Sequence, residues 1–105
     1  MKSISEMINE SIDNAKKNVH NMIQIQDKEI ETCIECISAH LIKGDPWKDI
    51  YNLRQKFTYL GACKTTKQTM IEFFEGVFGQ TYDQYVKEMK EESEVAAQEA
   101  KDNNG

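Results

Sequence analysis

The sequence predicts an all-α protein in which a long N-terminal helix is followed by three shorter helices, together forming a small helical bundle. Three observations support this prediction. The first forty residues contain no glycine or proline, apolar residues recur at helical spacing, and no segment alternates polar and apolar residues with a period of two. A chain of 105 residues is large enough for one modest core. We therefore expect a single helical domain over residues 1–90 and an acidic, frayed tail over residues 91–105.

The first helix is predicted over residues 3–43. Ser3 and Glu6 have the spacing of a capping box, and Gly44 is a suitable C-terminal stop. Isoleucines and other apolar residues recur every eleven positions between these ends, which places them on one helix face. The rows are Ile8, Val19, Ile30 and Leu41; Ile12, Ile23 and Ile34; and Ile4, Ala15, Gln26 and Ile37.

Such a helix would be roughly 60 Å long, far more than the ~13 Å radius of gyration of a compact domain of this size. Two outcomes are open. The helix breaks near residues 24–27 and packs on its own domain, or it projects and buries its stripe against a partner. In the second case we expect a homodimer formed through Ile8, Ile12, Val19 and Ile23.

The remaining helices are predicted from caps and turns. Asp45 and Pro46 start a second helix that Gly61 ends, residues 62–66 form a loop, and a third helix spans residues 66–78. Gly79 ends that helix, and Thr81 with Gln84 starts a fourth. The expected apolar faces are Trp47, Ile50, Leu53, Phe57 and Leu60; then Met70, Phe73, Phe74, Val77 and Phe78; then Tyr82, Tyr85, Val86 and Met89.

Charge is unevenly distributed along the chain. The net charge of −5 divides into −3 over residues 1–49, +4 over residues 50–71 and −6 over residues 72–105. We call residues 50–71 the basic segment. Its cations, together with three nearby aromatic residues, are the predicted partner-binding surface. These residues are Arg54, Lys56, Lys64, Lys67, Trp47, Tyr51 and Tyr59.

Part of this segment, residues 60–70 with the sequence LGACKTTKQTM, resembles the turn and recognition helix of a helix-turn-helix DNA-binding motif. Gly61 would be the turn glycine, and Lys64 and Gln68 are residue types that reach phosphates and bases. Phe57 and Lys67 depart from the packing positions of the motif, and the acidic net charge opposes phosphate binding. The resemblance implies a DNA-binding regulator with a degenerate motif in residues 53–75, as an alternative function.

Three cysteines and a histidine form the sharpest cluster of reactive groups. Cys33, Cys36 and His40 share one side of the first helix, and Cys63 could approach from the predicted loop. Zinc accepts such ligands, but the spacing matches no zinc finger, so buried core cysteines are the favoured interpretation and no metal or cofactor is assigned. Three cysteines cannot form a closed disulfide set, which favours a reducing cytoplasmic location.

Sequence motifs for catalysis are absent, so we expect no enzyme. No apolar run approaches membrane-spanning length, and the N-terminus lacks a signal peptide. Twelve lysines against one arginine, with eleven isoleucines, suggest AT-rich codons.

The predicted function is a non-catalytic protein–protein interaction module: a small cytosolic adaptor, inhibitor or assembly factor, phage or mobile-element encoded and acting on a host protein. A structural metal-binding protein is a third alternative.

Overall fold

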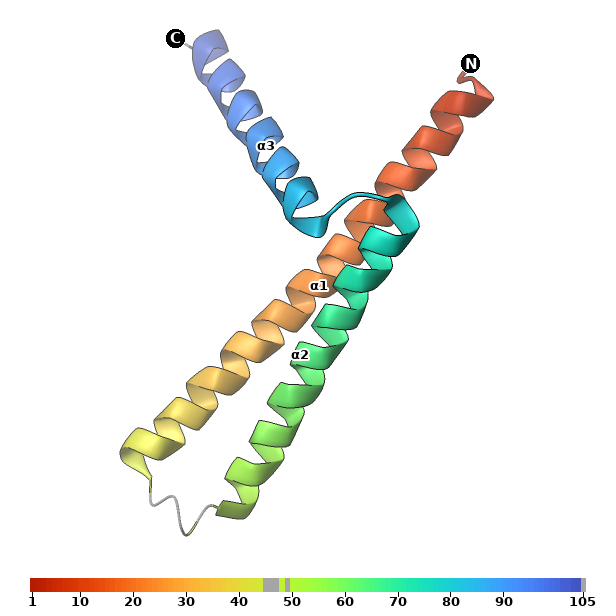
Figure 1. The fold of residues 1–105 in the computed structure, drawn as a ribbon. Helices are drawn as coiled ribbons and strands as arrows, with labels where there is room; N and C mark the ends of the chain where they lie inside the picture. The colour runs from red at the N-terminus through yellow and green to blue at the C-terminus, as the bar shows by residue number, and fades with distance from the viewer. Residues whose placement is uncertain (45–47, 49, 105) are drawn as a thin grey trace. The chain divides into compact units, whose positions relative to one another are not determined.

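The computed structural model describes residues 1–44, 48 and 50–104, without the side chains of 103 and 104. It contains three helices, α1 (Ile4–Lys43), α2 (Ile50–Phe78) and α3 (Tyr82–Asn104), and no strand within these residues (Figure 1). The all-α prediction is confirmed, but the prediction of four helices is wrong. The chain divides into two compact units, Met1–Glu72 and Phe73–Gly105, which are described separately.

Helix α1 is continuous, without a break at residues 24–27. Its predicted ends are confirmed: the Ser3 side chain accepts a hydrogen bond from the Glu6 backbone N–H at 3.1 Å, and Gly44 is the C-cap. A Cβ atom at Gly44 would lie 2.8 Å from the carbonyl oxygen of His40, closer than real Cβ contacts. Glycine is therefore required at this end, because the cap N–H must approach that carbonyl to bond with it at 3.0 Å.

In the first unit α1 and α2 lie side by side and antiparallel, as a helical hairpin (Figure 1). Between residues 19 and 40 the inward side chains of α1 are spaced alternately by four and three residues, and those of α2 follow the same rule. This seam consists of Val19, Ile23, Gln26, Ile30, Cys33, Ile37 and His40 on α1, and Leu53, Lys56, Leu60, Cys63, Lys67 and Met70 on α2. The period is the heptad of a coiled coil, not the eleven-residue repeat expected from the isoleucine rows.

The buried part of this seam is small. Cys33, Ile37 and Leu53 form its core cluster, with Leu60 packed against them. The Cys33 thiol also donates to the backbone carbonyl of Lys56 at 3.3 Å, which ties the two helices together at mid-length. Ile34 and Leu41, which the eleven-residue rows placed on the inner face, are instead exposed beside the seam.

Helix α2 continues through Gly61, so the predicted loop at residues 62–66 is wrong. A glycine inside a helix costs up to ~1 kcal/mol relative to alanine. Leu60 and Cys63 on either side of Gly61 both lie in the seam, and their packing against α1 outweighs this cost. The predicted helix start at Asp45 and Pro46 lies outside the described residues.

The second unit is held by one aromatic cluster. The Phe74 ring, with no exposed surface, lies 4.9 Å from Phe78, 5.5 Å from Tyr82 and 5.1 Å from Tyr85 between centroids. The turn between the helices has the predicted caps. Gly79 adopts φ +65°, a left-handed conformation that favours glycine, and the Thr81 hydroxyl accepts from the Gln84 N–H at 3.3 Å. Phe73 and Val77, predicted to face inward, are exposed.

Helix α3 extends to Asn104, and its side chains from residue 90 to residue 102 are all exposed. Seven acidic residues line this helix from Asp83 onward. No buried contact stabilises this stretch within the described residues, so its helicity depends on local propensity. Fraying of residues 91–105 stays a prediction.

Candidate interaction surfaces

The basic segment is not one exposed surface in the hairpin. Lys56 and Lys67 are half-buried in the seam, and the Lys67 ammonium pairs with the Asp27 carboxylate at 2.6 Å. Arg54 and Lys64 are exposed. The antiparallel arrangement sets the basic segment beside the acidic middle of α1, so much of its charge is compensated within the chain. Only two of the four cations of the basic segment are therefore exposed.

The aromatic residues predicted to bind a partner are also separated. Tyr51 is 71% exposed, and Tyr59 is half-exposed and donates its hydroxyl hydrogen to the Glu29 carboxylate at 2.9 Å. Trp47 lies outside the described residues. Tyr59 therefore bridges the two helices, and Tyr51 is the more exposed of the two tyrosines.

The Tyr59 bridge is expected to appear in a titration. The hydrogen bond to Glu29 and the nearby Cys63 thiol raise the pKa of Tyr59 from 10 to about 12. Because the folded-state pKa is raised, the bridge contributes its full stability below pH 10 and loses it as the pH rises towards 12. Difference absorbance between the wild type and Tyr59→Phe should show one tyrosine ionising late. Glu29→Gln should return that pKa towards 10, and an unchanged pKa would contradict the bridge.

The cysteines and the histidine do not converge. Cys33 and Cys63 are buried in the seam, which confirms the core interpretation for these two, whereas Cys36 is exposed and His40 is half-buried. Within the described residues no group of three or more His, Cys, Asp or Glu side chains is placed to hold a metal ion. The structure therefore gives no support to the metal-binding alternative.

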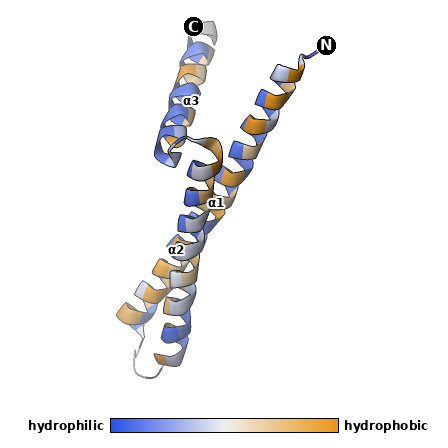
Figure 2. Cartoon of the chain, turned by 45° about the vertical axis from the view of Figure 1, so that its right-hand side comes forward, coloured by the Kyte–Doolittle hydropathy of each residue, from blue (hydrophilic) through white to orange (hydrophobic). Residues whose placement is uncertain are grey.

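The N-terminal part of α1 is the first candidate binding surface. Every side chain of residues 1–14 is exposed, including Ile4, Ile8 and Ile12. Figure 2 shows hydrophobic residues recurring along this end of α1. These three isoleucines, spaced by four residues, lie on the same side of α1 as the seam. Of the other predicted self-association residues, Val19 is half-buried and Ile23 is fully buried, so Ile23 presents no surface to a second chain.

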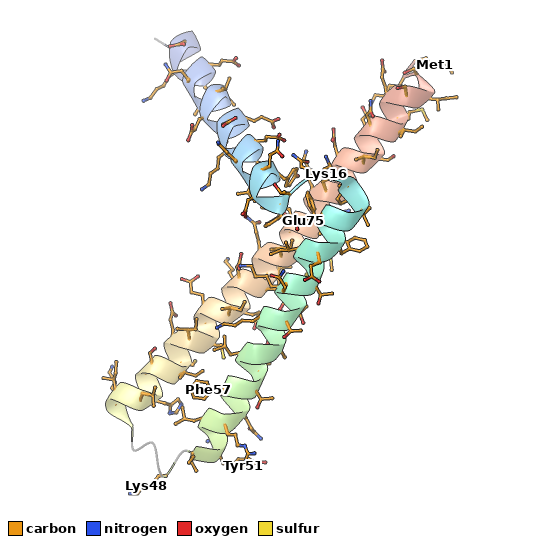
Figure 3. All side chains as sticks on the ribbon, in the orientation of Figure 1. Met1, Lys16, Lys48, Tyr51, Phe57 and Glu75 are labelled. Atoms are coloured by element: carbon orange, nitrogen blue, oxygen red, sulfur yellow. The ribbon has the colours of Figure 1, made fainter. Side chains whose placement is uncertain are left out.

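The second candidate surface lies along one flank of the hairpin. With Ile37 and Leu53 at heptad position a, four exposed apolar residues all occupy position e. These are Ile34 and Leu41 on α1, and Ile50 and Phe57 on α2, with 45–54% of each residue exposed. We call this set the e flank. Figure 3 shows Phe57 between the two helices.

The register of the hairpin brings these residues together. Cys33 bonds to Lys56, and Glu29 bonds to Tyr59. Continuing this antiparallel register sets Ile34 level with Phe57 and Leu41 level with Ile50. Sequence reasoning had assigned all four residues to buried faces. The seven-residue spacing within each pair, one place after the d position of its heptad, is the pattern that could have identified them.

The helix-turn-helix interpretation requires a turn at Gly61. Residues 60–70 instead form part of the continuous helix α2, so this turn is absent. Lys64 and Gln68 lie on the exposed surface of that helix, and no second helix follows Gly61 to dock beside it.

None of the helices, over the residues described, combines the length and hydropathy needed to cross a lipid bilayer. Comparison with known proteins gives no assignment: no family model, no curated protein and no solved structure matches the chain.

Proposed function

We propose that this chain is a non-catalytic protein-interaction module that binds a helix of another protein through the N-terminal segment of α1, residues 1–14. The observation that carries the proposal is the exposed stripe of Ile4, Ile8 and Ile12. It continues the side of α1 that forms the seam further along the helix. A helix face with apolar residues at this spacing is suited to packing against another helix.

The hairpin supplies the support for such a surface. Over residues 19–43 α1 is held by α2, so the preceding turns extend from an anchored helix whose first turn is capped by Ser3. A preformed helix loses less conformational entropy on binding than a segment that folds during binding. The small polar side chains on either flank of the stripe, Ser5, Asn9 and Ser11, are exposed and would form its polar rim.

Small adaptors, inhibitors and assembly factors are the protein classes that this surface suits. Cys33 and Cys63, packed in the seam as free thiols, support action in a reducing cytoplasm.

Site-specific photocrosslinking in the cells that express the chain tests this proposal. A photoreactive residue at Ile8 should crosslink to another protein, whereas the same residue at Asp13, which is exposed and turned away from the stripe, should not. Unlabelled wild-type chain should compete for the crosslink. The triple variant Ile4→Glu, Ile8→Glu, Ile12→Glu should not compete, with unchanged helicity by circular dichroism.

Three results would overturn the proposal. These are equal crosslinking at both positions, competition by the triple variant as effective as that of the wild type, and a crosslink at Ile8 only to a second copy of the chain. The last result would assign the segment to self-association.

A further inference from the structure

We infer that two copies of the hairpin associate through their e flanks into a four-helix bundle, with the helix α1 of each copy packed on α2 of the other. This surface, on residues 24–41 of α1 and 50–68 of α2, is separate from the N-terminal stripe and lies wholly within the first unit. The inference therefore stands independently of the proposed function.

The first step is the pattern of apolar residues. A two-helix coiled coil needs apolar residues only at a and d, whereas a bundle helix also carries them at e or g. Near the inter-helix connection both helices of this hairpin carry apolar residues at e: Ile34 and Leu41 on α1, Ile50 and Phe57 on α2. Each of these residues is half-exposed, so the hairpin alone leaves the e positions of both helices only partly buried.

The second step is charge complementarity, which selects a second copy as the occupant. On the side of α1 next to the e flank lie Asp27 and Glu31, and on the corresponding side of α2 lie Arg54 and Lys64. If the twofold axis runs parallel to the helices, α1 of one copy faces α2 of the other. Acids then face bases, and Asp27, which pairs with Lys67 of its own chain, also lies level with Lys64 of the second copy.

The alternative twofold axis, perpendicular to the helices, gives no such pairing. It would stack α1 on an antiparallel α1 and α2 on an antiparallel α2, so the acids of α1 would not face the bases of α2 in the second copy. The parallel axis also brings the apolar residues of the two e flanks into contact, because Ile34 meets Phe57 and Leu41 meets Ile50 of the other copy. A single surface that is complementary to itself in this way is what an isologous dimer requires.

The third step concerns Gly61, one turn from Phe57 on the same side of α2. A Cβ atom there would meet nothing within 4 Å, so the hairpin itself gives no packing reason for a glycine. A glycine allows the backbone of another element to approach closely. In the proposed bundle α1 of the second copy crosses α2 at this level, near its Glu31.

The bundle contact is small, because the apolar part of the e flank extends over only two heptads. Interfaces below the ~1,200 Å² lower limit of the standard size are typical of transient complexes. We therefore expect a weak dimer whose population rises with concentration, measurable by sedimentation equilibrium between about 1 µM and about 500 µM.

The apolar contact is tested by Ile34→Glu with Phe57→Glu, which should raise the dissociation constant more than about tenfold. The matched control, Met22→Glu with Ile25→Glu, replaces two exposed apolar residues away from the e flank and should leave it unchanged. Ile4→Glu with Ile8→Glu should also leave it unchanged, which separates this dimer from N-terminal binding. Circular dichroism checks folding, and if the double variant loses helicity, Leu41→Glu alone takes its place.

The arrangement of the helices is tested by the sign of a charge reversal. Lys64→Glu should weaken the dimer, because it would face Asp27 of the second copy, whereas Lys87→Glu on α3 has the same change in net charge and should have little effect. A dimer that Lys64→Glu leaves unchanged or strengthens would overturn this arrangement. A wild-type chain that stays monomeric throughout, or an Ile34→Glu, Phe57→Glu variant that dimerises normally, would overturn the inference itself.

Discussion

Replacing Phe74 with alanine is expected to lower the free energy of unfolding by about 3–5 kcal/mol. Phe74 has no exposed surface, and it is the ring that Phe78, Tyr82 and Tyr85 all contact in the second unit. The alanine variant loses the transfer free energy of the ring and leaves a cavity that three aromatic neighbours cannot fill without moving. Urea unfolding followed by circular dichroism measures the loss.

The neighbouring Phe73 provides the control, because it has the same side chain on the same helix but is 56% exposed. Phe73→Ala should change the free energy of unfolding by less than about 1 kcal/mol. Equal losses for the two variants would show that Phe74 is not the centre of this cluster.

Ile23→Asp is expected to destabilise the chain by more than about 4 kcal/mol, because it places a carboxylate at a fully buried position of the seam. That loss is a large part of the 5–15 kcal/mol by which small domains are usually stable. Ile23→Val, which removes one methyl group, should cost only about 0.5–1.5 kcal/mol. Thermal unfolding of the wild type and the two variants measures this order of stability directly.

Ile25→Asp is the matched control for the buried charge, because Ile25 is 58% exposed on the same helix. Its effect should be within about 1 kcal/mol of the wild type. If Ile23→Asp were tolerated as well as Ile25→Asp, the seam would not pass through residue 23.

The sequence was sufficient to predict the helix ends that depend on local chemistry. Ser3, Gly44, Gly79 and Thr81 act through hydrogen bonds to residues three or four positions away, so their roles follow from spacing alone. Gly61 was misinterpreted because its helical state depends on packing against α1, and that contact joins residues more than twenty positions apart. Local propensity cannot report such a contact.

The candidate surfaces were harder to predict for the same reason. The basic segment counts as +4 along the sequence, but Lys67 is paired with Asp27 forty positions earlier. The predicted isoleucine rows repeat every eleven residues, whereas the observed seam repeats every seven. Both patterns include Ile23, Ile30 and Ile37, but only the predicted rows include Ile34 and Leu41. The inner and outer residues could be separated only once the partner helix and its register were known.

The antiparallel hairpin also determines what a ribosome-bound chain exposes while it is being made. All of α1 is synthesised before the residues of α2 that cover it, and at roughly 5–20 residues per second the 29 residues of α2 take on the order of 1.5–6 s to add. Helices form in about a microsecond, so translation sets how long the apolar side of α1 stays bare. During those seconds Ile23 and Ile37 are as accessible as Ile8 and Ile12, and neighbouring nascent chains on one messenger RNA present the same stripe to each other.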